Sequence, residues 1–256
     1  MTFSAEQVAD EFLESARKGV AYPPAWFDRL SMDEALQVQH AILERKVAAG
    51  EQHVGWKVGL TAKAIQEQFS VHEPVCGYLL HSGMINSGAE RQCASLIGPG
   101  LENEICFRMG EDLTGPNVDA AMARAAVSEL YPAMELVENR GDFTAQLAVS
   151  LGDNVQQSGF ILGKPLALSS EFDIAAVDAS VYINDELVGE GSATAVLGNP
   201  FNSLAWLANK LSETNLSIKA GHWVMAGSLT RQFAVSQGDR IRTEFTGLGT
   251  VEFSLT

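Results

Sequence analysis

The stretch Leu101-Glu102-Asn103-Glu104-Ile105-Cys106-Phe107 places two carboxylates two residues apart and follows them with apolar side chains. The apolar residues predict a β-strand, and side chains two apart on a strand point to the same face. Glu102 and Glu104 would then stand roughly 7 Å apart along the strand, close enough to hold one hard cation. A metal site on this strand is the resulting hypothesis.

A third acid, Glu135, lies inside Pro132-Ala133-Met134-Glu135-Leu136-Val137, which reads as another buried strand. A lone buried carboxylate is costly, so its presence there calls for a partner. Three carboxylates without a Cys or His cluster favour Mg²⁺ or Mn²⁺ over zinc. Each Glu taken alone is more often a solvated strand residue, so the hypothesis depends on the set of three.

The composition is that of a globular protein with a substantial core. The chain has 256 residues, of which 46% are hydrophobic and 19% charged. Its formal net charge of −15 argues against nucleic-acid binding and against docking on anionic membranes. The N-terminus shows no secretory signal, and no apolar run reaches the roughly 20 residues that span a bilayer. Three cysteines without a CxxC pair predict reduced thiols in a cytoplasmic protein.

The first part of the chain predicts helices over residues 4–18 and 31–50, with Ser4 and Ser31 as N-caps. We expect residues 1–53 to form a helical N-terminal segment and residues 54–256 to form one catalytic unit. A short strand over residues 54–61 contains Lys57 among apolar neighbours and leads into a helix over 62–69. The spacing alone favours Lys57 as an edge-strand lysine with its charge in solvent, and the functional alternative is a cation held against an anion or a catalytic base.

Further along, residues 74–98 read as loop, 118–130 as helix and 152–159 as a polar loop. A hairpin is predicted over residues 179–188, with Asn184 and Asp185 at its turn. Residues 189–193 form a Gly-rich stretch, Pro200 opens another helix, and strands follow at 222–226, 240–245 and 250–255. The Gly-rich stretch lacks the Walker and Rossmann patterns, so nucleotide binding is set aside.

Several motifs occur together in a characteristic order. They are Gly55-Trp56-Lys57-Val58-Gly59-Leu60-Thr61, Glu102-Asn103-Glu104-Ile105, the Glu135 stretch, Asp153-Asn154, Leu197-Gly198-Asn199-Pro200 and Gly247-Leu248-Gly249-Thr250-Val251. In this the chain resembles the 2-oxopent-4-enoate hydratase and 2-oxo-3-hexenedioate decarboxylase family, within the fumarylacetoacetase-like superfamily. The resemblance covers nearly the whole chain.

The resemblance implies an α+β fold, a mixed β-roll or barrel of the fumarylacetoacetase C-terminal type with peripheral helices. It implies Mg²⁺ (or Mn²⁺) on Glu102, Glu104 and Glu135, with Lys57 as the active-site lysine. The substrate would be a small anionic 2-oxo acid from meta-cleavage breakdown of aromatics, whose enolate the metal would stabilise. Substrate contacts are expected at Leu60, Asp153, Asn154, Gln156 and Ser228.

Four features depart from the family pattern or divide its branches. Hydratases usually carry an acid where this chain has Val75, and decarboxylases carry an apolar residue there. Glu73 is then a candidate for the water-activating base, although a solvated loop acid is the plainer interpretation. Gly100 replaces a basic residue often found two positions before the first metal ligand, and bulky residues 155–157 replace small ones. Residues 206–208 are closer to the hydratase pattern.

These observations lead to a ranked set of functions. The first is a metal-dependent hydratase acting on a 2-hydroxy-2,4-dienoate, and the second is a 2-oxo-3-hexenedioate decarboxylase. Carbon–carbon bond hydrolysis would need a His-Glu pair that we do not find in the sequence. A non-catalytic partner subunit is the alternative of a different class, and three intact acids argue against it. We expect a homo-oligomer, either alone or in complex with a related lyase.

Overall fold

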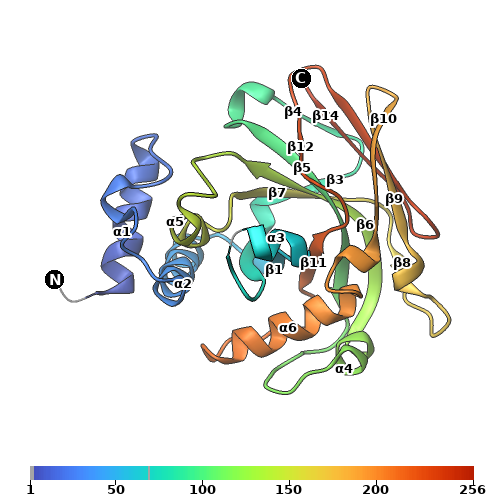
Figure 1. The fold of residues 1–256 in the computed structure, drawn as a ribbon, viewed down its shortest axis with the longest axis horizontal. Coiled ribbons are helices and arrows are strands. Elements are labelled where there is room, and N and C mark those ends of the chain that lie inside the picture. The colour runs from blue at the N-terminus through green and yellow to red at the C-terminus, as the bar shows by residue number, and fades with distance from the viewer. Residues whose placement is uncertain (1–2, 69) are drawn as a thin grey trace.

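Two β-sheets and a set of peripheral helices make up the structure, a computed structural model that describes residues 3–68 and 70–256. The larger sheet curls around the centre of the molecule, and the smaller one stands beside it (Figure 1). The strands of the larger sheet are β1 (His53–Gly59), β2 (Val75–Leu80), β3 (Met84–Asn86), β5 (Pro99–Met109), β6 (Val127–Glu138), β7 (Gln157–Leu162), β8 (Leu166–Ala167), β11 (Trp223–Ser228) and β12 (Phe233–Ala234).

The main path through this sheet runs β2-β1-β11-β5-β6-β7-β3, with β12 paired to β5 and β8 paired to β6. Most neighbours are antiparallel, but β1 and β11 are parallel, as are β3 and β7. The smaller sheet has the order β10-β9-β13-β14-β4. Its strands are β4 (Ala89–Arg91), β9 (Asp178–Ile183), β10 (Glu186–Ser192), β13 (Arg240–Phe245) and β14 (Gly249–Leu255). The mixed β architecture with peripheral helices expected from the sequence is confirmed.

The helices lie outside the sheets. They are α1 (Ala5–Arg17), α2 (Met32–Ala48), α3 (Lys63–Gln68), α4 (Ala120–Ala125), α5 (Leu147–Gly152) and α6 (Pro200–Ser212), with 3₁₀ turns at Pro24–Trp26, His81–Gly83, Cys93–Ser95, Ile174–Ala176 and Ala193–Ala195. Figure 1 shows α1, α2 and α5 gathered on one side of the strands, while α4 and α6 lie together at another. In the described ranges, no helix is both long and apolar enough to cross a bilayer.

The predicted helix starts are confirmed by their caps. The Ser4 side chain accepts a hydrogen bond from the amide of Gln7, and Ser31 forms a reciprocal capping box with Glu34. Asn199 caps α6, with Pro200 at the first helical position, where its missing N–H is not needed. The predicted end of the helix over 62–69, at Phe69, lies outside the described residues.

The N-terminal helices pack into the same hydrophobic core as the strands. Val8 and Phe12 of α1 and Val38 of α2 are buried in this core. The buried amide of Gln39 donates hydrogen bonds to the carbonyl oxygens of Cys76, in β2, and Leu151, in α5. These bonds attach α2 to both elements beside it. The boundary at residue 53 stays a prediction.

Three predicted elements differ in the structure. The helix predicted over 118–130 ends as α4 at Ala125, and β6 begins at Val127, because the apolar positions of this stretch fit either period. The loop predicted over 74–98 contains β2, a continuous buried run without the alternation that marks a half-buried strand. Gly189 and Gly191 belong to β10, where Cβ atoms would collide with Phe233 and Leu229.

Candidate active site

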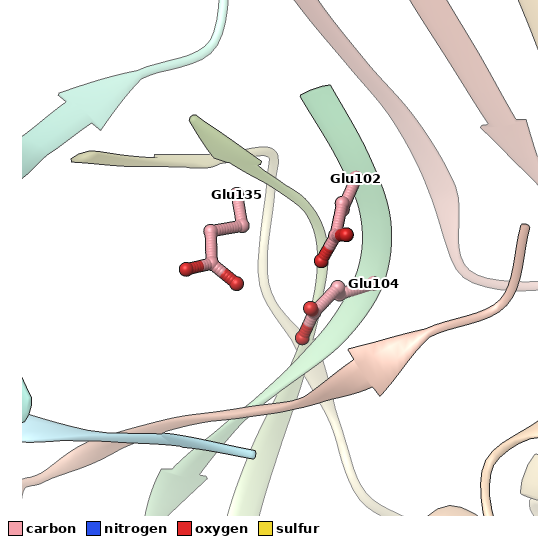
Figure 2. Close-up of side chains that lie close together, drawn as sticks. All are labelled: Glu102, Glu104 and Glu135. Carbon is pink, nitrogen blue, oxygen red and sulfur yellow. The ribbon is translucent and has the colours of Figure 1, made fainter. Parts of the chain in front are cut away.

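Three carboxylates converge on one face of the larger sheet. Glu102 and Glu104 are two apart on β5, and Glu135 of β6 is the direct cross-strand partner of Glu102. Directly opposed residues on antiparallel strands point to the same face, so the sheet ladder itself brings the third acid to the first two. One carboxylate oxygen from each residue lies within 4.8 Å of the others, and Figure 2 shows the side chains pointing toward one another.

Buried oxygen atoms in this cluster lack hydrogen-bond partners. Glu104 and Glu135 are 1% and 0% exposed, whereas Glu102 is only partly buried. Oε2 of Glu104 accepts a hydrogen bond from the amide of Gly227 at 2.8 Å, made possible by an irregularity in the β11–β5 pairing. Among the described residues, Oε1 of Glu104 and Oε2 of Glu135 have no hydrogen-bond partner. Such an arrangement is unfavourable for the protein alone and suits a divalent cation with oxygen ligands.

The pKa values of the three carboxyl groups also indicate that the cluster lacks positive charge. Burial, followed by the charge of Glu135, raises the pKa of Glu102 to about 7, although Lys57 opposes the change. Burial and the two neighbouring carboxylates raise the pKa of Glu104 well above its ordinary value. Burial also raises the pKa of Glu135, and the adjacent Lys57 is the main opposing influence. Three closely spaced acids therefore resist ionising together unless positive charge is added.

Lys57 supplies one positive charge beside the acids. It lies on β1, is 2% exposed, and places Nζ 3.2 Å from Oε1 of Glu135. The same ammonium donates a hydrogen bond to the carbonyl oxygen of Val155. A fully buried lysine needs such partners. The alternative of a solvent-exposed edge-strand lysine is therefore wrong.

The carbonyl that receives Lys57 belongs to an unusual backbone turn. Asn154, Val155 and Gln156 have φ values of 65°, 52° and 60°, three consecutive residues in the left-handed region without a glycine. This conformation is costly, most of all for the β-branched Val155. The Asn154 side chain holds the turn against β2, because its Oδ1 accepts from the amide of Tyr78 and its Nδ2 donates to the Tyr78 carbonyl.

A cavity of about 840 Å³ opens beside the acids and Lys57. Glu102 and Lys57 border it directly, and so do three of the residues expected to contact substrate: Leu60, Gln156 and Ser228. Gln156 donates a weak hydrogen bond of 3.4 Å to the carbonyl oxygen of Gly141, and the Ser228 hydroxyl accepts one from the amide of Asn103. This volume is typical of small-molecule sites.

Comparison with known proteins assigns the chain to a family. The model of the fumarylacetoacetate (FAA) hydrolase C-terminal family matches residues 47–256. The chain belongs to this family. It is 32% identical to 2-hydroxyhexa-2,4-dienoate hydratase of Comamonas testosteroni over 89% of this chain and 87% of that protein. It is 33% identical to 4-oxalocrotonate decarboxylase of Pseudomonas putida over 88% of this chain and 86% of that protein.

A solved structure agrees with this assignment. The 4-oxalocrotonate decarboxylase of Pseudomonas putida G7, complexed with magnesium and adipate, superposes with a TM-score of 0.93 at 29% identity, covering 100% of this chain and 99% of the other. The expected fumarylacetoacetase-like fold is thus confirmed. Both branches named from the sequence are represented among the relatives.

Of the residues predicted to act in catalysis or to contact substrate, three do not border the main cavity of this FAA hydrolase family member. Glu73 lines a different cavity, with Trp206, and its exposed carboxylate pairs with Lys210 at 3.0 Å. Asp153 lines a third cavity and is ion-paired with Arg140 at 2.6 Å. Asn154 is occupied by Tyr78, as described above. Glu73 therefore has no contact with the acid cluster, while Asp153 and Asn154 support the cavity wall from behind.

Several other residues of the site have little or no signal in the sequence. Arg140 lies between the main and third cavities, and its guanidinium is held by Asp153 and Glu138. Its only signal was its place directly after the Glu135 strand. Gly227 and Arg231 have no local signal, because each depends on how β11 and β12 pair with β5.

Proposed function

We propose that the protein is a Mg²⁺- or Mn²⁺-dependent lyase that adds water to a 2-hydroxy-2,4-dienoate or its 2-oxo tautomer. The observation that carries the proposal is the convergence of three largely buried carboxylates within 4.8 Å, beside a buried lysine, at the edge of a cavity. Relatives named as hydratases of such acids, at about a third identity over most of the chain, support this substrate class.

Glu102, Glu104 and Glu135 are the residues that would hold the ion. Their oxygen donors suit a hard cation, and the oxygens without hydrogen-bond partners are available to it. When bound, the ion would supply positive charge that stabilises the enolate form of a 2-oxo acid. The Gly227 amide fixes the orientation of Glu104, so the donor set is organised before the ion arrives.

Lys57 is the group placed to move a proton. Its ammonium has three N–H donors, of which Glu135 and the Val155 carbonyl engage two. The third is available to a substrate oxygen or carbon in the cavity. Because Glu135 and Val155 hold Nζ in one position, Lys57 can donate a proton to the carbon chain of a conjugated 2-hydroxy acid and regain the proton that the 2-hydroxyl group loses.

Decarboxylation of 2-oxo-3-hexenedioate is the second candidate, and one position favours it. A methyl carbon of Val75 lies 3.3 Å from the point where a Cβ on Gly59 would stand, and Nζ of Lys57 lies 3.7 Å from that same point. The residue beside Lys57 is therefore apolar. Activation of water calls for a base, whereas loss of carbon dioxide does not.

The test is to incubate the protein with Mg²⁺ and either 2-hydroxypenta-2,4-dienoate or 2-oxo-3-hexenedioate. A hydroxylated 2-oxo acid supports the hydratase, and released carbon dioxide supports the decarboxylase. Chelation should stop either reaction, and Glu102→Gln should reduce it at least about 100-fold. Failure to turn over either acid, together with no change in melting temperature on adding Mg²⁺, would refute a metal-dependent lyase and favour the partner-subunit alternative.

The oligomeric state and cellular location of the protein are the last parts of the proposal. We expect a homo-oligomer, alone or with a related lyase, in the cytoplasm. Light scattering of the purified protein tests the assembly, and a monomeric mass at micromolar concentration would contradict it.

A further inference from the structure

Three cations border the main cavity, and two of them are already paired. Lys57 is bound to Glu135, and Arg140 is held by Glu138 and Asp153. Arg231 is different, since no carboxylate among the described residues forms an ion pair with it. Its guanidinium makes a long hydrogen bond to the carbonyl of Gln232 and retains free N–H donors.

The position of Arg231 is fixed by the strand that carries the acids. The Asn103 side chain donates a hydrogen bond to the Thr230 hydroxyl, which in turn donates to the carbonyl of Arg231. Asn103 lies between Glu102 and Glu104 in the sequence, so this chain of bonds ties the Arg231 segment to the strand that carries the acids. The guanidinium also stacks over the ring of Phe233 at 4.2 Å, and that ring is buried. An arginine whose backbone and guanidinium are both held in place loses little conformational entropy when it binds an anion.

The pairing of the strands places Arg231 beside Glu102. Ser228 pairs with Glu104 and Phe233 pairs with Leu101, so the segment between them runs along β5 at the level of Glu102. Gly100 leaves room for this segment, because a Cβ there would overlap the amide nitrogen of Gln232. Arg231 therefore borders the cavity on a segment that runs beside the strand carrying Glu102.

We propose that Arg231 binds the second carboxylate of a dicarboxylic 2-oxo acid, and so selects diacids over monoacids. The inference rests on the proposed function, which places the first carboxylate near the three acids and their ion. A guanidinium can take a carboxylate through two parallel N–H bonds, a geometry that lysine does not offer. The substrate class indicated is thus an enedioate, whether it loses carbon dioxide or gains water.

Two six-carbon acids provide a direct test. Adipate and hexanoate differ in the second carboxylate, and neither reacts. Calorimetric titration of the Mg²⁺-loaded protein should show tighter binding of adipate than of hexanoate. Arg231→Gln should weaken adipate binding about 10- to 100-fold, the cost of a lost charge-assisted bond, and change hexanoate binding less than about twofold. Arg231→Lys should restore only part of the adipate affinity.

Arg242→Gln is the matched control, since Arg242 also stacks on an aromatic ring at 4.2 Å, over Tyr182 of β9, and does not border the cavity. Equal affinity of the wild type for both acids, or no binding of either, would overturn the inference. An adipate preference that survives Arg231→Gln would do the same. An Arg231-dependent preference without any lyase turnover would leave the inference standing and refute the proposed function.

Discussion

Lys57 and Glu135 form a buried pair whose members depend on each other. Lys57 is 2% exposed and Glu135 is fully buried, and neither charge would be tolerated there alone. Removing one partner of such a pair leaves an uncompensated charge. The same ion pair therefore affects both the stability of the protein and the position of the lysine proposed to transfer protons.

Lys57→Met should reduce kcat/KM by about 100- to 10,000-fold, the range for a group that moves protons. The matched control is Lys210→Met. Lys210 is also an ion-paired lysine that borders a cavity, but its cavity is the separate one lined by Glu73. Steady-state kinetics on both variants check this, with circular dichroism to show that each is folded. Similar losses in the two variants would contradict a specific role for Lys57.

Glu104→Gln should have opposite effects on stability and on metal binding. Without metal the variant should melt at a higher temperature, because a neutral amide relieves repulsion among three acids whose pKa values are raised. Its Mg²⁺ affinity should fall at least about 100-fold, more than the loss of an outer partner would cause. Thermal melts with and without Mg²⁺ measure both effects.

Glu252→Gln, an exposed acid on β14, is the control and should change neither quantity. A Glu104→Gln variant that melts below the wild type without metal would show that the acids are not in conflict.

At the scale of elements, the N-terminal segment packs against the outside of the cavity wall. Tyr22, between α1 and α2, packs its ring against Gly141, which follows β6. A Cβ at Gly141 would stand within 2.7 Å of Cε2 of Tyr22. Gly141 and Gln156 border the cavity and are hydrogen-bonded to each other. The N-terminal segment thus supports the cavity wall, a role that its distance in sequence from the wall residues does not suggest.

Gly141→Ala should lower the free energy of unfolding by about 1–3 kcal/mol, as overpacking does, and weaken substrate binding by displacing Gln156. Adding Tyr22→Ala should recover part of the loss due to Gly141→Ala, because the colliding ring is gone. A double-mutant cycle from urea unfolding measures this coupling. Strictly additive effects of the two substitutions would contradict the contact.

The elements were predictable where sequence period and caps agree. Ser31 with Glu34 identified α2, and Asn184 with Asp185, both at positive φ, identified the β9–β10 turn. The helix predicted over 118–130 is wrong at the junction of α4 and β6, because one apolar pattern there suits both a helix and a strand. The loop predicted over 74–98 is also wrong at β2, because this strand is a continuous buried apolar run without the alternation typical of a half-buried strand.

The whole molecule carries a second group of titratable residues, half-buried and away from the acids. His40, His53 and Trp56 lie together, and His53 also contacts His222 at 5.0 Å between ring centroids. Burial lowers the pKa of His40 and of His222 to about 4, with the neighbouring His53 lowering each further. Burial also lowers the pKa of His53. The folded protein thus excludes protons that the unfolded chain takes up near pH 6.5.

Relative to His40→Gln, the wild type should lose stability as the pH falls from about 6.5 to about 4. A lowered histidine pKa means that the unfolded state binds more protons in this window, so stability rises with pH, by at most about 1.4 kcal/mol per pH unit for one group. Urea midpoints at several pH values measure the difference. A constant difference across the window would show that His40 titrates normally in the fold.

The site as a whole was only partly predictable. Spacing placed Glu102 and Glu104 on one face, and an acid in an apolar strand marked Glu135. Gly227 and Arg231 could not be found in this way, because the pairing of distant strands brings Gly227 to Glu104 and Arg231 to the cavity. Glu73 illustrates the opposite case, since proximity in sequence to the cavity residues did not bring it to the cavity.

The cross-strand pairing of Glu102 with Glu135 has a consequence for how such a protein can be redesigned. The separation between the acids is set by the hydrogen-bond ladder of β5 and β6, so insertions in distant loops would leave the ion cradle intact. A slip of one residue in β5 would instead turn both of its acids to the other face at once. Engineers can therefore exchange rim segments to alter substrate preference, while the register of these two strands must be left untouched.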